Sequence, residues 1–174
     1  MAVDIAEELV GAYLAEIEKC DHVLYNVRAP GGGLQGLREL DVIGLRFSDK
    51  AAYLCEVTTH LRGLLIGNYA STIKKIKEKH DWQVEYAKNQ LKDFKPEFQF
   101  WSPWVPRGAL LQGLGEITGL RLVVNSDYTR RVKDLQNEAK KQQPSPTNNM
   151  AYRLIQILEH LREADDSVDP QTPA

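Results

Sequence analysis

The feature that most constrains the fold is a pair of apolar, strand-like segments joined by a very short turn. Residues 38–47 and residues 51–58 are rich in aliphatic and aromatic side chains, and only residues 48–50 separate them. A connection this short cannot hold a crossover, so the two segments are predicted to pair as antiparallel strands. Residues 22–29 form another strand-like segment just upstream, which predicts a small meander.

A helix precedes these strands, and helices alternate with strands after them. Apolar side chains follow helical spacing over residues 4–20. Downstream, the periodicity and the turn residues predict helices over 69–91, 108–117, 126–141 and 151–161, and strands over 97–105 and 120–124. This order predicts an α/β fold with a mixed four- to five-stranded sheet flanked by helices. We expect one domain over residues 1–164, followed by a disordered acidic tail over 165–174.

Composition limits the class of protein. Hydrophobic residues make up 43% of the chain and charged residues 26%, as in ordinary globular proteins. No apolar run reaches the roughly 18 residues of a membrane helix, and the N-terminus lacks the features of a signal peptide. Cys20 and Cys55 form neither a disulfide framework nor a metal-ligand spacing. These features predict a cytoplasmic protein that does not contact membranes.

The net charge of −2 hides an uneven distribution of charge. Acidic side chains concentrate at both ends of the chain, whereas lysines and arginines concentrate over residues 62–95 and 121–141. Basic helices of this kind are typical of a surface that contacts nucleic-acid phosphates. The alternative, in which the lysines only solvate the outer faces of helices, stays open from this pattern alone.

One group of polar residues on the predicted hairpin has the spacing of a metal site. Asp41 lies in one strand and Glu56 in the next, so pairing through the turn allows both carboxyls to share one face of the sheet. Thr58 is two residues beyond Glu56 and points to that same face. Carboxylates placed in this way can hold Mg²⁺ near a phosphate. Acidic residues on a solvent-facing strand give the same pattern, and the spacing does not decide between the two.

Four short segments of the first 60 residues follow a known pattern. They are EELVGAYL at 7–14, NVR at 26–28, RELDVIGL at 38–45 and YLCEVT at 53–58. Together they resemble the YraN-type predicted endonucleases, a group of the PD-(D/E)XK nuclease superfamily beside the Holliday-junction resolvases. The resemblance implies a restriction endonuclease-like three-layer core. Two positions depart from the family pattern: Thr58 stands where the family has a lysine, and Arg38 stands where it has a glycine.

The resemblance also implies roles for particular residues. Asp41 and Glu56 would bind Mg²⁺ or Mn²⁺ together with the carbonyl of Val57, and Glu7 would complete the shell directly or through water. The missing positive charge would come from the following helix, where Lys77 flanks the predicted buried stripe and Lys74 lies farther out. His60, beyond the end of the strand, is a second candidate for a catalytic group, as a general base.

The substrate implied by the resemblance is DNA, in repair or defence. The basic helices over 69–91 and 126–141 are predicted to contribute to its binding. The candidate contacts are Arg28, Lys74, Lys75, Arg130 and Arg131. A protein partner and a homodimer remain open alternatives.

Two functions from different classes are consistent with the sequence. One is a metal-dependent DNA endonuclease, which the pair Asp41 and Glu56 favours. The other is a nuclease-fold module that has lost catalysis and binds nucleic acid or a protein, which Thr58 favours.

Overall fold

The computed structural model describes residues 3–28, 39–61, 64–141 and 147–166, and the side chains of α5 as far as residue 162. Within this part of the chain, five strands form a single sheet in the order β1-β2-β3-β4-β5. The strands are β1 (His22–Arg28), β2 (Glu39–Arg46), β3 (Ala51–Val57), β4 (Lys95–Ser102) and β5 (Leu120–Val124). The helices are α1 (Ile5–Glu16), α2 (Tyr69–Gln90), α3 (Ala109–Gly115), α4 (Ser126–Lys141) and α5 (Met150–Asp166).

The sheet is mixed, as the sequence predicts. β1, β2 and β3 form an antiparallel meander, and the turn between β2 and β3 gives the pairs Arg46 with Ala51 and Leu45 with Ala52. β4 and β5 run parallel to β3 because helical connections return the chain to the same edge of the sheet. The predicted α/β class and the five-stranded sheet are confirmed.

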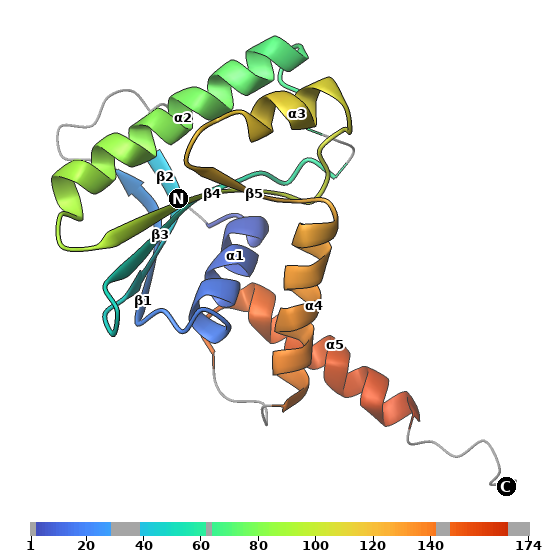
Figure 1. The fold of residues 1–174 in the computed structure, drawn as a ribbon. Helices are drawn as coiled ribbons and strands as arrows, with labels where there is room; N and C mark the ends of the chain where they lie inside the picture. Colours follow the sequence, from blue (N-terminus) through green and yellow to red (C-terminus); the bar gives the residue numbers. More distant parts are fainter. Residues whose placement is uncertain (1–2, 29–38, 62–63, 142–146, 167–174) are drawn as a thin grey trace, which may run out of the picture.

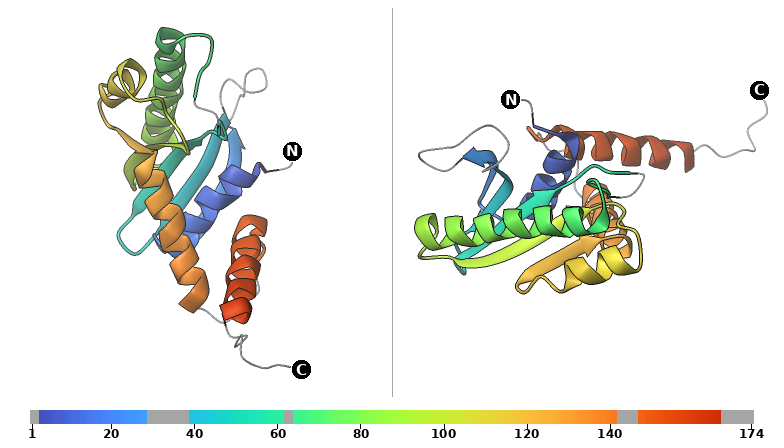
Figure 2. Two further views of the ribbon diagram at one scale, coloured as in Figure 1. Left: turned by 90° about the vertical axis from the view of Figure 1, so that its right-hand side faces the viewer. Right: turned by 90° about the horizontal axis from the view of Figure 1, so that it is seen from above.

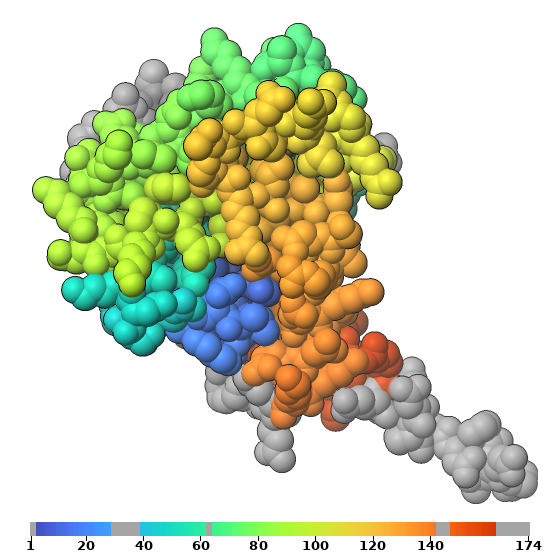
Figure 3. Space-filling model, in the orientation of Figure 1, coloured from blue at the N-terminus to red at the C-terminus, as the bar shows by residue number. Residues whose placement is uncertain are grey.

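The helices cover both faces of the sheet. α2 and α3 pack on one face, whereas α1 and α4 pack on the other (Figure 1). Two further views show the same layers, with α5 outside α1 and α4 (Figure 2). In the space-filling view, α2 and α3 form the upper surface of the molecule and α4 the lower one (Figure 3). No helix in the described ranges is long and apolar enough to cross a membrane.

Each face of the sheet has its own hydrophobic core. The core under α1 and α4 contains Leu14, Val42 and Trp101, all nearly inaccessible to solvent. The core under α2 and α3 contains Phe100 and Leu110. Because side chains alternate along a strand, Phe100 and Trp101 point to opposite faces of β4 and belong to different cores.

Local signals fix the helix starts that border the site. Asp4 caps α1 by accepting a hydrogen bond from the Ala6 N–H at 2.8 Å, and Glu7 accepts one from the Asp4 N–H at 3.2 Å. Asn68 caps α2 by accepting a hydrogen bond from the Ser71 N–H at 2.8 Å.

The C-terminal end of the fold differs from the prediction. α5 continues to Asp166, beyond the predicted end of the helix at residue 161, so residues 165 and 166 belong to the helix and not to a tail. The rest of the predicted disordered tail, residues 167–174, lies outside the described residues.

α1 approaches β1 closely at Gly11. A Cβ atom placed there would lie 2.6 Å from Cζ of Tyr25, whose hydroxyl accepts a hydrogen bond from Asn149 at 3.2 Å. Gly11→Ala is therefore expected to lower the free energy of unfolding by about 1–3 kcal/mol, as overpacking of a core usually does. Chemical denaturation measures this change.

Gly115→Ala is the matched control, because a Cβ at Gly115 meets nothing within 4 Å. Removing a helical glycine there is expected to stabilise the protein by up to about 1 kcal/mol. Equal effects of the two substitutions would contradict the packing of α1 on β1.

Candidate active site

Asp41 and Glu56 lie together on the sheet face that α2 covers. The register pairs Val42 with Cys55, and continuing it by one residue brings Asp41 opposite Glu56. Both residues are buried, with 9% and 7% of their surface exposed. The Lys79 ammonium contacts both carboxyls, so they lie close together on one face of the sheet, as predicted.

A lysine of α2 contacts both carboxyls. The Lys79 ammonium pairs with Oε1 of Glu56 and lies 3.8 Å from Oδ1 of Asp41. Its side chain is 26% exposed, so it reaches the buried carboxyls from the edge of the helix. The sequence therefore carries a positive charge at this site, although it lacks a lysine at position 58.

The prediction of Lys77 for this role is wrong. Lys77 is 59% exposed and forms an ion pair of 2.6 Å with Asp81 on the same helix. Lys74 is also exposed and pairs with Glu78 at 3.8 Å. Both lysines point to solvent.

The error has a physical reason, which is that polar residues form part of the buried face of α2. Thr72 and Gln83 are both buried on this face. The Thr72 hydroxyl donates to the Asn68 carbonyl at 2.8 Å, and the Gln83 amide donates to the Leu54 carbonyl at 3.1 Å, so these polar groups keep a partner away from water. A buried stripe predicted mainly from the apolar residues of the helix is therefore rotated about the helix axis relative to the observed buried face. Lys79 follows Ile76 by three residues and precedes Gln83 by four, so it lies on the same side of the helix.

The backbone at the end of β3 holds Asp41 in place. The Val57 N–H donates to Oδ2 of Asp41 at 2.8 Å, and the following Thr58 N–H donates to the Trp101 carbonyl at 3.0 Å. Asp41 is therefore oriented by the strand that carries Glu56.

Asn26 adopts an uncommon backbone conformation beside this pair. It lies in β1 between Tyr25 and Val27, which pair with Val42 and Leu40 on either side of Asp41. Its φ is 52°, in the left-handed region that asparagine tolerates better than most residues. Its side chain interacts with the Glu7 carboxyl and acts to lower the pKa of Glu7, which places Asn26 near α1.

Glu7 lies near the carboxyl pair and also helps to cap α1. Burial raises its pKa, and the charge of Asp41 contributes to the rise. Among the described residues, no group of three or more His, Cys, Asp and Glu side chains is arranged to hold a metal ion. The role of Glu7 in completing a metal shell stays a prediction.

Thr58 and His60 interact with each other just beyond β3. The Thr58 hydroxyl and Nδ1 of His60 form a hydrogen bond, and Thr58 is partly buried whereas His60 is exposed. Thr58 has no charge to contribute to the site.

The predicted nucleic-acid contacts have different environments. Lys75 is exposed. Arg28 pairs with Glu39 at 3.1 Å, and Arg130 pairs with Asp127 and Asp134 on its own helix. These residues reach the surface.

Arg131 does not reach the surface, and its prediction as a nucleic-acid contact is wrong. Its side chain is 3% exposed, and its guanidinium packs over the rings of Tyr13 and Trp101. It pairs with Glu18 and Asp127 and so belongs to the core under α4. In addition, α2 and α4 lie on opposite faces of the sheet, so the two basic helices do not form one surface (Figure 2).

The electrostatics of the site follow from placing two carboxyls beside one ammonium. Burial, followed by the charge of Asp41, raises the pKa of Glu56 to about 8. Burial also raises the pKa of Asp41, although the Lys79 charge and the Val57 N–H oppose the rise. Burial acts to lower the pKa of Lys79, but the Glu56 and Asp41 charges outweigh it and raise this pKa. Near neutral pH, Lys79 is therefore charged and Glu56 retains much of its proton.

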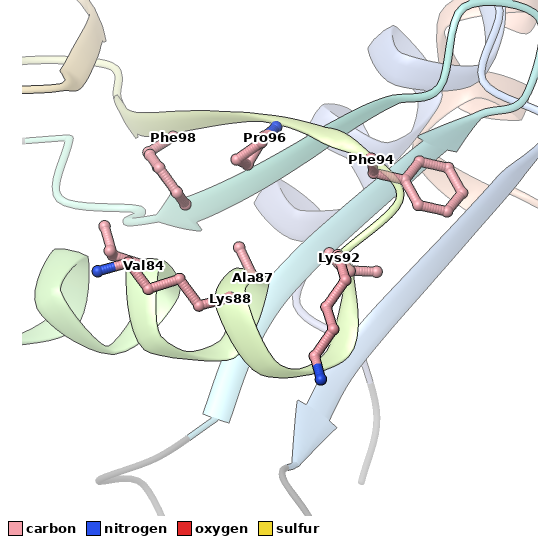
Figure 4. A pocket seen from close by; sticks show the side chains of 8 residues that line it. Val84, Ala87, Lys88, Lys92, Phe94, Pro96 and Phe98 are labelled. Carbon is pink, nitrogen blue, oxygen red and sulfur yellow. The ribbon is translucent and has the colours of Figure 1, made fainter.

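A separate groove lies between the second half of α2 and β4. Val84 and Ala87 line it on the helix, and Pro96 and Phe98 line it on the strand (Figure 4). Its volume is about 350 Å³, and it shares no lining residue with the carboxyl pair. The groove is mostly apolar, and Lys88 and Lys92 also line it.

Comparison with protein families, curated proteins and solved structures found no match for this chain. The candidate site therefore rests on the geometry of Asp41, Glu56 and Lys79.

The raised pKa of Glu56 predicts a pH-dependent stability. Between the ordinary carboxyl pKa of 4.5 and about 8, the native state binds a proton that the unfolded state does not. The stabilisation is complete below this range and is lost as the pH rises through it. Relative to Glu56→Gln, the wild type should lose on the order of 1–3 kcal/mol of unfolding free energy between about pH 5 and about pH 8.5.

Denaturation curves at several pH values measure this difference. Glu97→Gln removes an exposed carboxyl of β4 and is the control, with little change relative to wild type. A wild type that gains stability over Glu56→Gln as the pH rises would contradict the protonated, buried state of Glu56.

Proposed function

We propose that the protein is a metal-dependent nuclease that hydrolyses phosphodiester bonds of DNA, with its catalytic cation on α2 instead of at the end of β3. The observation that carries the proposal is the contact of the Lys79 ammonium with both Asp41 and Glu56. In the nuclease family that the first 60 residues resemble, a lysine two residues after the glutamate supplies this charge. Here Lys79 offers it from a different element.

The donor set suits a hard divalent cation. Mg²⁺ is usually bound through one or two carboxylates, with water and substrate phosphate completing its shell. Asp41 and Glu56 offer two adjacent carboxyls, and the proton that Glu56 holds at neutral pH can be exchanged for a metal ion. When bound, Mg²⁺ or Mn²⁺ supplies charge stabilisation for the phosphoryl oxygens.

The residues of the chain then have distinct tasks. Asp41 is oriented by the Val57 N–H, so one of its oxygens is fixed and the other faces Lys79. Lys79, released from Glu56, can neutralise negative charge on the phosphate or orient the attacking water. Removing one electrostatic stabiliser of this kind typically costs a factor of about 10²–10³ in rate.

The surface of α2 supports a nucleic-acid substrate. Lys74, Lys75 and Lys77 are exposed on the helix that carries Lys79. DNA approaching the carboxyl pair would therefore meet a basic helix. The compartment we propose for this activity is the cytoplasm.

The contact of Lys79 with both carboxyls is also compatible with a second function. Lys79 already pairs with both carboxyls, and Thr58 provides no charge, which suits a site that has stopped binding metal. The protein would then be a nuclease-fold module that binds nucleic acid or a protein partner. Cleavage assays separate the two functions.

Lys79→Ala is predicted to lower Mg²⁺- or Mn²⁺-dependent DNA cleavage by a factor of about 10²–10³. Lys77→Ala, two residues away and exposed, should cleave at a rate near that of wild type. The double variant Lys79→Ala/Thr58→Lys should recover part of the lost rate, because it restores an ammonium at the end of β3.

Thermal melts of each variant show whether it is folded. Equal activity of wild type and a folded Lys79→Ala would remove Lys79 from the mechanism. A folded wild type that cleaves no DNA with either metal, and is not activated by Thr58→Lys, would leave the binding module as the function.

A further inference from the structure

α5 has an unusual distribution of polar and apolar residues. Its inner face contains buried Tyr152, Gln156 and Glu159 and packs against α1 and α4. Its outer face carries an exposed aliphatic row, here called the α5 stripe: Met150, Leu154, Ile157, Leu158 and Leu161. Ala151 is buried and Ile155 is partly buried on the inner face, so the α5 stripe is a second apolar face that an ordinary surface helix lacks.

The α5 stripe has the spacing of a helix-pairing seam. Met150, Leu154, Ile157 and Leu161 follow one another at intervals of four, three and four residues. This alternation is that of the a and d positions of a coiled coil, which insert between the side chains of a facing helix. The stripe is thus suited to contact another helix.

The stripe is part of a larger apolar surface. Leu154 also lines a pocket of about 290 Å³ together with Ile5 and Leu61. Ile5 is 57% exposed and Leu61 76% exposed. Together with the α5 stripe these residues form a surface of seven large apolar side chains, each between 48% and 76% exposed. Contiguous apolar patches of this kind mark interaction sites.

The segments outside the described residues are poor in large apolar side chains. Residues 1–2, 62–63, 142–146 and 167–174 contain Met1 and Val168 as their large apolar residues, and residues 29–38 contain two leucines. Five aliphatic side chains at seam spacing need a matching row, and none of these segments provides one.

A lipid surface also fits poorly. Helices that lie in a membrane interface present lysines or arginines on a solvated face opposite the apolar one. The α5 stripe is purely aliphatic, and the opposite face of α5 packs on α1 and α4.

We propose that the α5 stripe is a homodimer interface, in which α5 of one copy pairs with α5 of a second copy about a two-fold axis. A two-fold axis brings the same row of Met, Leu and Ile against itself, so the surface is complementary to its own copy. This proposal does not depend on the proposed nuclease function.

Sedimentation velocity of the full chain from about 1 µM to about 100 µM is the test, and a dimer is expected within this range. Ile157→Glu should raise the dissociation constant at least about 100-fold, because the two-fold axis places the new charge in the seam twice. Leu161→Glu should have the same effect and carries the test if Ile157→Glu fails to fold, as judged by circular dichroism. Leu24→Glu, which changes an exposed leucine on β1, is the matched control and should leave the dimer intact.

A wild type that stays monomeric at about 100 µM would overturn the proposal. A dimer that persists in folded Ile157→Glu and Leu161→Glu would also overturn it, since the interface would then lie elsewhere.

Discussion

The burial of two carboxyls against one ammonium is the interaction on which this end of the structure depends. An isolated buried carboxylate is costly, and two adjacent ones are costlier still unless a cation or a proton compensates them. Lys79 supplies the cation, and the raised pKa of Glu56 supplies the proton. The remaining contacts serve this arrangement: the Val57 N–H orients Asp41, and Gln83 fixes α2 to β3 through the Leu54 carbonyl.

The position of the lysine on a helix has a mechanical consequence. A lysine at position 58 would be held by the same strand that carries Glu56, whereas Lys79 depends on the packing of α2 over β3. The helix is held there by its buried face, which includes Ile76 and Ala87. Changes in that packing therefore act on the charge balance of the site, and the α2 face links the fold to the proposed chemistry.

Much of the fold followed from the sequence because its signals are local. The short turn between β2 and β3 requires an antiparallel pair, and that pair brings Asp41 opposite Glu56. The prediction of Lys77 failed because hydrogen bonds from Thr72 and Gln83 to backbone carbonyls place polar residues on the buried face of α2. The prediction of Arg131 as a nucleic-acid contact failed for a similar reason, since the rings of Tyr13 and Trp101 that cover its guanidinium are distant in sequence. Tertiary partners of this kind leave no periodic signal.

A crystal of the wild-type protein soaked in Mn²⁺ tests the central claim most directly, because the anomalous signal of the ion locates it independently of activity. The account predicts a Mn²⁺ peak between Asp41 and Glu56, with the Lys79 ammonium moved off Glu56 but still on the same face of the sheet. Lys79 bridging both carboxyls with no Mn²⁺ beside them, or Lys79 turned to solvent, would contradict it.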